Sequence, residues 1–411
     1  MSSHLGGVWK YDDSPDSASS VVYESLHTNI PTSSMQLHDF PFKKGLPSFP
    51  SHSDVLEYLE TYAQHFGVDV FVRTDTKVTK ASKVGTQWRI HVESKHKGIY
   101  FEDFDRLVVA NGHHNKHWEA PIKGIDNFTG IVSHARSYRS PKPYRNKRVL
   151  IIGRGPSGQD ISLELAKSGA KEVYVAAFDY DPNVIDEKDK RILKAVVDYI
   201  AKDGTVVFTD GSTIAAPDEI LHCTGYLYTA TDFFPSELLA LKSNTVNDEA
   251  LAYLSEAITT GLVVAPLYKH IFPIKDPTAA FIGLPVSVPP FQCFELQSRW
   301  VARVFDGSVD LPCIEEMYND FSETLRNTNG SARKLHSLSG YETEHITELG
   351  ILSGSIVDDK IYEMYEDAAY LRVNFPHDFR SADFSLDPAT GKWVRRYKPS
   401  SNAAELVRVF S

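Results

Sequence analysis

RVLIIGRGPSGQDI, residues 148–161, is the stretch that decides the fold of this chain. It begins with the apolar run 149–152, which predicts a short strand buried in a parallel sheet. A glycine turn with the spacing G-x-G-x-x-G follows, and after it apolar residues recur at the helical period. A strand before this spacing and a helix after it are the context in which it predicts a dinucleotide-binding site. A strand, turn and helix with a purely structural role is the alternative.

The glycines of this turn have separate roles. Gly153 makes the tight turn, Gly155 lets the backbone approach a pyrophosphate, and Gly158 lets the helix pack on the strand. The phosphates then lie at N–H groups of the helix N-terminus, beside Ser157. Asp179 follows the next predicted strand, at the spacing expected for an acidic residue that binds the ribose. We therefore expect these five residues to contact a dinucleotide.

The bulk composition is that of a large globular protein. With 411 residues, of which 42% are hydrophobic and 24% charged, the chain can bury more than one core, so two or more domains are expected. The formal net charge of −11 argues against nonspecific binding to nucleic acid, because no basic surplus is available to meet phosphates.

Cysteine usage and hydropathy indicate the compartment. Cys223, Cys293 and Cys313 are widely spaced and odd in number, which favours a reducing compartment over a disulfide framework. No apolar run approaches the length of about 18 residues that a bilayer span requires. The N-terminus has no secretory pattern. We therefore expect a cytoplasmic protein, with peripheral association with the endoplasmic reticulum left open.

Local patterns predict elements on both sides of the fingerprint. Residues 51–67 have the periodicity and the end signals of a helix. Short runs from 68 to 101 predict strands of a small antiparallel meander, the first of them at 68–72. After the fingerprint, residues 171–179 predict the second parallel strand and residues 186–202 a charged helix.

One motif ahead of the fingerprint resembles a known family. Phe128, Gly130, His134 and Tyr138 have the spacing F-x-G-x-x-x-H-x-x-x-Y/F, which is similar to the identifying sequence of the flavin-containing monooxygenases. The related Baeyer–Villiger enzymes usually close this motif with Trp, so Tyr138 favours the flavin-containing branch. The fingerprint itself resembles the nicotinamide-nucleotide site of the family.

Shorter stretches extend the resemblance toward both ends of the chain. Each is similar to a motif of the family: GGVW at 6–9, LHTNIP at 26–31, CTGY at 223–226, LYKHIF at 267–272 and ELQSRW at 295–300. The family assignment therefore does not depend on the fingerprint alone.

The resemblance implies an α/β flavoprotein fold with two dinucleotide-binding, Rossmann-like domains. The expected division is the first part of an FAD-binding domain over 1–146, an inserted NAD(P)-binding domain over 147–216, and the second part of the FAD-binding domain with a C-terminal helical region over 217–411. The family carries a further G-x-G-x-x-G before its GGxW motif, whereas only five residues precede Gly6 here. We therefore expect an FAD-binding domain that is incomplete at its N-terminus and exposes apolar strand edges.

The resemblance also implies a reaction. NAD(P)H reduces FAD, the reduced flavin reacts with oxygen, and a flavin hydroperoxide oxygenates a soft nitrogen or sulfur atom. The expected partners are a small molecule with such an atom and molecular oxygen, with no metal, no nucleic acid, and a homodimer left open. The second function considered is a noncatalytic remnant or short isoform that binds a nucleotide but no longer holds FAD.

The residues of the flavin site follow from the family motifs. Asn29 occupies the position that faces the flavin ring, so it is the side chain expected to be catalytic. Further cofactor contacts are expected at residues in glycine turns or in matched motifs: Gly6, Gly7, Trp9, Gly112, Gly225 and Gln297.

Plainer roles compete for several of these residues. Asn29 could cap a loop, and Trp9 could be a core aromatic. His134 and Tyr138 could hold the linker between the domains rather than take part in chemistry. The histidines at 113–114 are expected to be exposed turn residues.

The choice between the two nicotinamide nucleotides depends on the end of the second strand. NADPH specificity usually needs a cation there, and relatives tend to carry Ser and Arg. This chain has Ala176, Ala177 and Phe178 instead, followed by Asp179. A carboxylate repels a 2′-phosphate and accepts a hydrogen bond from a 2′-hydroxyl. We therefore expect a weakened preference for NADPH, with NADH competent.

Overall fold

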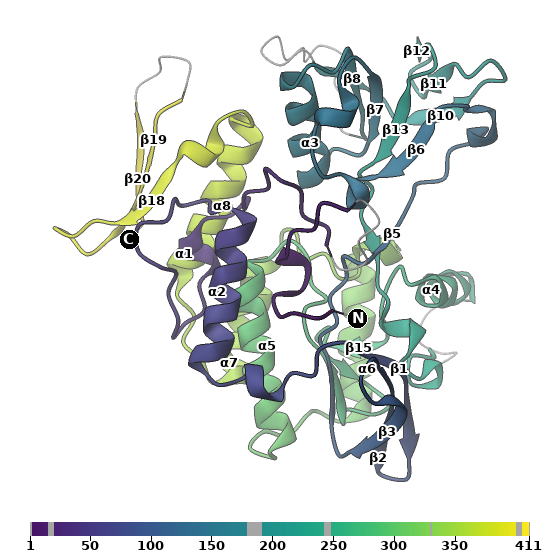
Figure 1. Ribbon diagram of the computed structural model, residues 1–411. Helices are drawn as coiled ribbons and strands as arrows, with labels where there is room; N and C mark the ends of the chain where they lie inside the picture. The colour runs from purple at the N-terminus through teal and green to yellow at the C-terminus, as the bar shows by residue number, and fades with distance from the viewer. Residues whose placement is uncertain are drawn as a thin grey trace.

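Figure 1 shows the computed structural model of the protein. An α/β region carries a parallel sheet at the top and an antiparallel sheet at the bottom, and helices cover the opposite side. The structure describes residues 2–14, 20–178, 191–241, 248–328, 331–399 and 405–410. Within these ranges no helix combines the length and the hydropathy that crossing a membrane would require.

A five-stranded parallel sheet contains the fingerprint strand. Its strands lie in the order β6 (Ile131–His134), β13 (Glu219–His222), β7 (Arg148–Ile152), β8 (Glu172–Ala176) and β9 (Arg191–Lys194). The central strand β7 is buried over its middle three residues, as predicted from its apolar run. Helix α3 (Pro156–Lys167) follows the glycine turn and packs on the sheet through the fully buried Ile161 and Leu165.

A second, antiparallel sheet shares a core with the parallel one. It consists of β10 (Val197–Ile200), β11 (Val206–Phe208) and β12 (Thr213–Ile214). Ile200, Val206 and Phe208 from this sheet pack with Leu150 and Ile220 of the parallel sheet. The two sheets together form the upper region of Figure 1.

The lower region contains the predicted meander and a short parallel pair. The meander comprises β1 (Thr76–Val84), β2 (Gln87–Ser94) and β3 (Gly98–Phe104), all antiparallel. Beside it, β4 (Leu107–Val109) pairs in parallel with β17 (Ala279–Phe281). Among the described residues the other edge of β4 has no strand partner, and Val108 on this strand is 47% exposed. The expected incompleteness of the FAD-binding domain stays a prediction.

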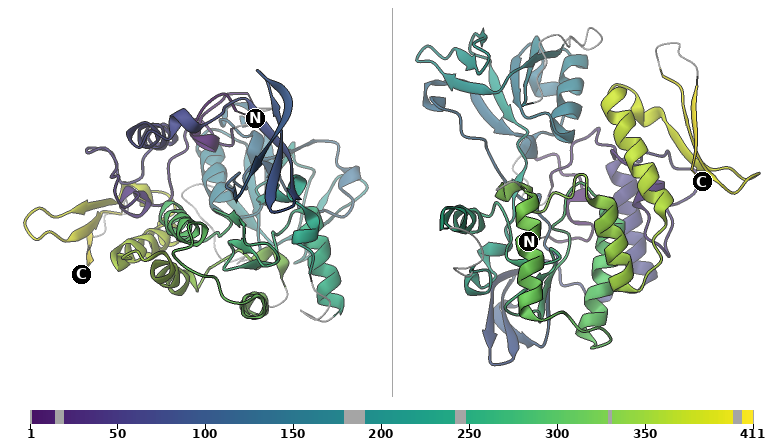
Figure 2. Two further views of the ribbon diagram at one scale, coloured as in Figure 1. Left: turned by 90° about the horizontal axis from the view of Figure 1, so that it is seen from below. Right: turned by 180° about the vertical axis from the view of Figure 1, so that it is seen from behind.

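Helices α1, α2, α5, α7 and α8 lie on the side of the molecule opposite these sheets, whereas α4 lies on the same side as the meander (Figures 1 and 2). Helix α5 packs on α7, and Trp300 of α5 is buried in the largest core cluster. The helices are α1 (Thr32–Met35), α2 (His52–His65), α4 (Asp248–Thr260), α5 (Pro290–Phe305), α6 (Ile314–Asn327), α7 (Glu342–Ser353) and α8 (Asp359–Asn374). Helix α2 begins where its end signals predicted, with a capping box between Ser51 and Asp54.

Short strands complete the fold. Two-stranded pairs connect loops: β5 (Lys116–His117) with β14 (Tyr226–Leu227), and β15 (Leu267–Tyr268) with β16 (Phe272–Pro273). The C-terminal sheet consists of β18 (Asp383–Leu386), β19 (Trp393–Tyr397) and β20 (Leu406–Phe410). This sheet is tied to α8 by Arg395, whose guanidinium forms a buried ion pair with Asp367 at 2.8 Å.

Two sequence-based predictions of local structure are wrong. The described part of the predicted helix at 186–202 forms strands β9 and β10, because its apolar residues Ile192, Val197 and Ile200 extend the two sheets. The run at 68–72 is not a strand: residues Asp69–Phe71 form a 3₁₀ turn after α2. There Val70 and Phe71 are 76% and 83% exposed, so no buried sheet face is available to hold an alternating strand.

Candidate nucleotide and flavin site

The glycine turn between β7 and α3 is packed against its neighbours at two positions and open at the third. A Cβ atom on Gly153 would lie 2.7 Å from the carbonyl oxygen of Cys223, and Gly153 also has a φ of 99°. A Cβ atom on Gly158 would lie 2.1 Å from the carbonyl oxygen of Gly153. At Gly155 nothing lies within 4 Å of such an atom. Gly155 therefore leaves room at the surface for a ligand that approaches the backbone.

The start of α3 is arranged for an anion. The helix begins at Pro156, and no side chain caps its N-terminus. The N–H groups of the first turn of a helix have no partner inside the helix, and the helix dipole makes this end positive. Ser157 in this turn is exposed and Gly158 is buried against the strand. The turn therefore fits a pyrophosphate. Binding of a nicotinamide nucleotide at this turn stays a prediction.

The end of β8 carries no cation in its described part. Ala176 and Ala177 are buried, whereas Phe178 is 97% exposed. Asp179, the expected ribose ligand, lies outside the described residues. The side chains that follow β8 therefore offer no charge to a 2′-phosphate up to residue 178.

The family motif ahead of the fingerprint connects the linker to the nucleotide helix. Tyr138 is buried, and its hydroxyl donates to Glu164 of α3 at 2.7 Å. Gly130 is required for packing, since a Cβ atom there would lie 2.4 Å from the ring of Phe128. His134 ends β6 beside His222 of β13. These contacts agree with the linker role considered for His134 and Tyr138.

Burial keeps the histidine of this motif neutral. Desolvation, with smaller contributions from His117 and His222, lowers the pKa of His134 to about 4. The Nδ1 atom of His134 accepts from the N–H of Arg136 at 3.0 Å, which orients the ring. Its Nε2 atom is buried without a hydrogen-bond partner. The ring therefore serves at neutral pH as an uncharged polar group at the sheet edge.

A second group of predicted residues converges on Gly283, just after β17. Gln297 of α5 is fully buried, and its Oε1 accepts from the N–H of Gly283 at 3.0 Å. His113, which follows Gly112 after β4, hydrogen-bonds through Nδ1 to the carbonyl oxygen of Gly283 at 3.0 Å. The prediction of an exposed turn is therefore wrong for His113, because the loop after β4 folds onto the loop after β17. Burial lowers the pKa of His113 below its usual value.

Gln297 carries a structural indication of a missing partner. Its Nε2 atom is buried and has no hydrogen-bond partner. A buried amide donor left without an acceptor costs about 1–3 kcal/mol. A ring carbonyl of a flavin is an acceptor that would satisfy it. Gln297 and the loop at Gly283 therefore fit the ring end of FAD, while Gly112 lies in the same loop as His113 and has a φ of 70°.

Asn29 lies in a segment that packs with the N-terminal turn. Asn29 is half-buried, and the hydroxyl of Thr28 beside it donates to the carbonyl oxygen of Ile30 at 2.9 Å. Both the catalytic role and the loop-capping role of Asn29 stay predictions. The next residue, Ile30, belongs to a core cluster against which Trp9 packs. Gly6 and Gly7 form the start of that turn, both with positive φ, and Gly6 lies against Leu56 of α2. Trp9 is therefore at least partly a core aromatic.

The last predicted glycine lies at the end of β13. Gly225 has a φ of 88°, and its carbonyl oxygen accepts from the N–H of Trp118 at 3.0 Å. Cys223, two residues earlier, donates its N–H to Ile152 of β7 at 2.8 Å. Burial raises the pKa of the Cys223 thiol to about 12, so it remains protonated. The start of this CTGY turn is therefore hydrogen-bonded to the end of β7, directly beside the glycine turn of the predicted nucleotide site.

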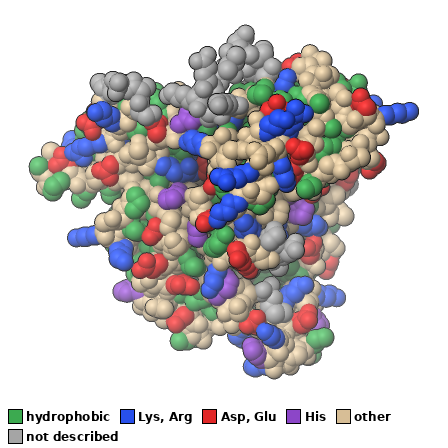
Figure 3. Space-filling model, turned by 45° about the horizontal axis from the view of Figure 1, so that its top comes forward, with side chains coloured by type: hydrophobic (Ala, Val, Ile, Leu, Met, Phe, Trp, Pro, Cys, Tyr) green, Lys and Arg blue, Asp and Glu red, His purple; other side chains and the backbone are tan. Residues whose placement is uncertain are grey.

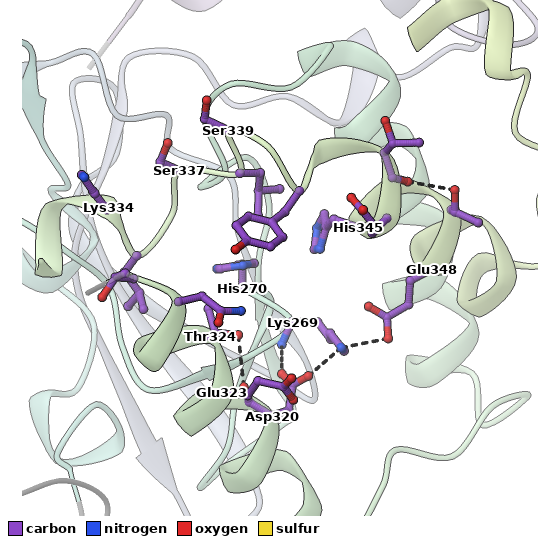
Figure 4. Close-up of a pocket in the computed structure, with 18 of the residues that line it drawn as sticks. Lys269, His270, Asp320, Glu323, Thr324, Lys334, Ser337, Ser339, His345 and Glu348 are labelled. Atoms are coloured by element: carbon purple, nitrogen blue, oxygen red, sulfur yellow. Dashed lines mark hydrogen bonds and ion pairs between the residues drawn. The ribbon is translucent and has the colours of Figure 1, made fainter. Parts of the chain in front are cut away.

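A large cavity lies elsewhere, between α6 and α7 (Figure 4). It has a volume of about 1080 Å³, and none of the predicted site residues lines it. His270 and His345 point into it, and Lys269 on its floor pairs with Asp320 and with Glu348, the latter at 2.8 Å. Lys269 and His270 both have positive φ, 50° and 61°, in the hairpin turn between β15 and β16.

The two histidines of this cavity are neutral. Burial lowers the pKa of His270 to about 4 and that of His345 to about 3. The Nδ1 atom of His270 lies 3.2 Å from Nδ1 of His336, and Nε2 of His345 is buried without a partner. Sequence reasoning missed these residues because LYKHIF matched only as a family motif, and nothing local indicates that its histidine faces a cavity.

The surface charge is mixed in sign. On the face drawn in Figure 3, acidic side chains lie among the basic ones rather than leaving a surface of one sign. In the ranges that the structure describes, no three His, Cys, Asp or Glu side chains are grouped so that they could hold a metal ion.

Comparison with known proteins places these features in a family. Residues 1–179 and 178–360 match the family model described as flavin-binding monooxygenase-like. Flavin-containing monooxygenase FMO GS-OX-like 2 from Arabidopsis thaliana is 37% identical over 77% of this chain and 70% of its own length. FMO GS-OX3 from the same plant is 32% identical over 92% of this chain and 83% of its own length.

Solved structures agree. The S-allyl-L-cysteine S-oxygenase of Allium sativum superposes with a TM-score of 0.81 at 31% identity, covering 92% of this chain and 88% of that one. Tmm from Pelagibacter sp. strain HTCC7211 has a TM-score of 0.78 at 21% identity, covering 95% of this chain and 87% of that one, and shows the same fold. Because the family model spans most of the chain and relatives above 30% identity cover most of it, the chain belongs to the flavin-containing monooxygenases, a family of oxidoreductases that in general use FAD and NADPH.

Proposed function

We propose that this protein is an FAD- and NAD(P)H-dependent monooxygenase that oxygenates a soft sulfur or nitrogen atom of a small molecule. The observation that carries the proposal is the open glycine turn at Gly155, where an uncapped helix N-terminus and free space coincide. The likeness to an S-oxygenase over 92% of the chain favours a thioether sulfur as the atom oxidised.

The residues divide the work of this reaction. The glycine turn and the first turn of α3, with Ser157, hold the pyrophosphate of the nicotinamide nucleotide. Gln297 and the loop at Gly112 hold the flavin ring end, together with Gly6, Gly7, Trp9 and Gly225 as further contacts. Asn29 is half-buried and carries an amide side chain, which can hydrogen-bond at the reactive edge of the ring. FAD supplies the oxygen chemistry when it is bound.

The overall reaction balances without an acid–base pair on the substrate. A thioether, molecular oxygen, NADPH and a proton give a sulfoxide, water and oxidised nucleotide. The sulfur lone pair forms the new S–O bond, and the nucleotide supplies the two electrons that reduce the second oxygen atom to water. The protein therefore needs to position groups and exclude water rather than to activate the sulfur.

The decisive experiment is a turnover measurement on the purified chain. We expect a flavin absorbance spectrum, oxidation of NADPH that depends on S-allyl-L-cysteine, and a sulfoxide that carries one atom of isotopically labelled dioxygen. Trimethylamine serves as the probe for nitrogen. A protein that holds flavin but oxidises neither probe would contradict the proposal.

A second function is favoured by one observation. The glycine turn after β4 leads into a loop and β5, not into a helix, and one edge of β4 is unpaired among the described residues. A protein that binds the nicotinamide nucleotide without holding FAD would fit this arrangement. Purified protein without flavin that still binds NADP⁺ would favour this noncatalytic function.

The nucleotide preference can be tested directly. Because Ala176, Ala177 and Phe178 offer no cation after β8, we expect the dissociation constants of NADPH and NADH to differ by less than about 10-fold. Replacing Phe178 with Arg should favour NADPH, since the new guanidinium meets the 2′-phosphate. The measurement is a titration of each reduced nucleotide with wild type and F178R. A large NADPH advantage in the wild type would show that the expectation is wrong.

A further inference from the structure

Helix α3, which begins at the predicted nucleotide site, forms an ion pair with an arginine from the C-terminal part of the chain. Arg380 lies in the 3₁₀ turn Phe379–Ser381, next to the buried Phe379. Its guanidinium donates two hydrogen bonds to Asp160 of α3, from Nη1 to Oδ1 at 3.1 Å and from Nη2 to Oδ2 at 2.6 Å. The two side chains are 28% and 21% exposed, so the pair is partly shielded from water. A two-point bond of this kind fixes the orientation of both groups.

The same guanidinium holds the segment that leads into Asn29. Its Nε atom donates to the carbonyl oxygen of Thr28 at 2.8 Å, and Nη2 lies 3.4 Å from the carbonyl oxygen of His27. On its other side this segment is fixed by the N–H of Thr28, which donates to Pro50 at 2.9 Å. Arg380 therefore connects the helix of the nucleotide site to the backbone one residue before Asn29.

Other contacts of α3 reach the same segment. The hydroxyl of Tyr23 donates to Asp160 at 3.1 Å, and Ser25 donates to Glu164 at 2.8 Å. Asp160 and Glu164 are one helical turn apart, so both carboxylates lie on one face of α3. That face is thus in contact with residues 23–28 through three side chains, and Arg380 is the one that also bonds to their backbone.

The base of Arg380 is rigid. Phe379 is 2% exposed and packs edge-on against Phe49, with ring centroids 5.4 Å apart. The guanidinium carbon of Arg380 lies 4.6 Å from the ring centroid of Phe379. The position of the guanidinium is therefore set by the packing of the neighbouring Phe379 in the core.

We propose that Arg380 is a positioning residue, which through Asp160 couples occupancy of the nucleotide site to the backbone that carries Asn29. A nucleotide whose pyrophosphate binds the N–H groups at the start of α3 shifts Asp160, and the guanidinium of Arg380 transmits this shift to the backbone at Thr28. The role rests on the proposed function, since it sets how the nicotinamide and the flavin ring meet. Lysine cannot replace it, because one ammonium group cannot reach Asp160 and two carbonyl oxygens in a planar arrangement.

Hydrogen–deuterium exchange tests the coupling without requiring turnover. In the wild type we expect NADP⁺ to slow exchange over residues 26–32 by about 3-fold or more, since coupling between sites is typically about 5- to 150-fold in equilibrium terms. In D160N, R380Q and R380K this protection should disappear, while the affinity for NADP⁺ stays within about 3-fold of wild type. The double variant D160N/R380Q should behave like either single variant, because each single substitution already removes the same Arg380–Asp160 ion pair.

A matched pair serves as control. Arg89 and Asp103 form a two-point ion pair on the meander, with both bonds at 2.8 Å. R89Q should leave the protection of residues 26–32 unchanged. If the wild type also turns over, R380K should slow flavin reduction by NADPH about 10-fold or more at unchanged melting temperature, which a merely structural role would not do.

The outcomes separate the two proposals. Protection that survives in D160N and R380Q would overturn the coupling, whatever the activity. A wild type that binds NADP⁺ and shows the protection but oxygenates no probe would refute the proposed function and leave the coupling supported. A wild type in which NADP⁺ binds without slowing exchange at 26–32 would overturn the coupling alone.

Discussion

Strands β7 and β4 both run in parallel with a neighbour and both end in a glycine turn, yet the two turns have different surroundings. β7 is paired on both edges and leads directly into α3. β4 is paired with β17 on one edge and leads through a loop into β5. The glycines differ as well: Gly158 is packed tightly, whereas a Cβ atom on Gly112 would meet nothing within 4 Å.

The difference shows that a glycine turn is not by itself a phosphate site. The turn after β7 presents a helix N-terminus to a ligand, and the packing of two glycines holds that end against the strand. The turn after β4 instead brings His113 onto Gly283, close to Gln297. The first turn fits a pyrophosphate and the second fits a flavin ring, because one offers helix N–H groups and the other offers loop and side-chain groups.

The largest expected effect is that of a side chain at Gly158. Valine there would place its Cβ atom 2.1 Å from the carbonyl oxygen of Gly153, so helix and strand must separate. We expect G158V to lose about 3 kcal/mol or more of unfolding free energy, together with nucleotide binding. Chemical denaturation checks the stability. An unchanged midpoint would show that the packing of α3 on β7 is not required.

The next effect is selective for the ligand. Gly155 has a φ of −66° and open space around it, so G155V should fold with a midpoint close to that of the wild type. Its branched side chain would occupy the space a pyrophosphate needs, and we expect nucleotide affinity to fall about 10- to 100-fold. Titration with NADP⁺ measures this. If G155V and G158V lost equal stability, Gly155 would also be required for packing and would not serve only the approach of the ligand.

Acid should destabilise the protein through buried neutral histidines in both regions. The pKa of His134 in the parallel sheet and that of His270 in the lower region are both lowered to about 4, below the unfolded value of about 6.5. The unfolded chain therefore binds more protons between these values, and stability present above pH 6.5 is lost as the pH falls toward 4. We expect up to about 1.4 kcal/mol per pH unit from each histidine.

The measurement is the unfolding free energy as a function of pH for the wild type and for H134Q and H270Q. Whatever the starting stability of each variant, its unfolding free energy should depend less steeply on pH over the same window. A slope unchanged in both variants would show that other groups govern acid unfolding.

The smallest expected effect lies in the turn after β4. Gly112 has a φ of 70°, which disfavours a side chain, but the space around it is open. We therefore expect G112A to cost about 1 kcal/mol of unfolding free energy and to leave NADP⁺ affinity unchanged. The same titration and denaturation experiments check both. A loss of NADP⁺ affinity in G112A comparable to that in G155V would mean that the two turns are not functionally distinct.

Much of this protein could be predicted from local sequence. The strand at 148–152, the glycine spacing and α3 follow from hydrophobic periodicity and from the special conformations that glycine permits. The helix at 52–65 and the meander follow in the same way. Where local pattern misled, at 186–202, a run with both helical and strand character was decided by the open edge of the parallel sheet.

Tertiary structure alone decided which distant residues meet. Nothing local indicates that Arg380 reaches Asp160, 220 positions away, or that His113 turns back onto Gly283. The cavity lined by His270 and His345 is likewise formed where a hairpin turn meets two consecutive helices, α6 and α7, that come later in the chain. The sequence by itself determined the family and the nucleotide turn, because these depend on neighbouring residues. The contacts that couple the turn to the rest of the protein depend on packing between segments, which no local pattern contains.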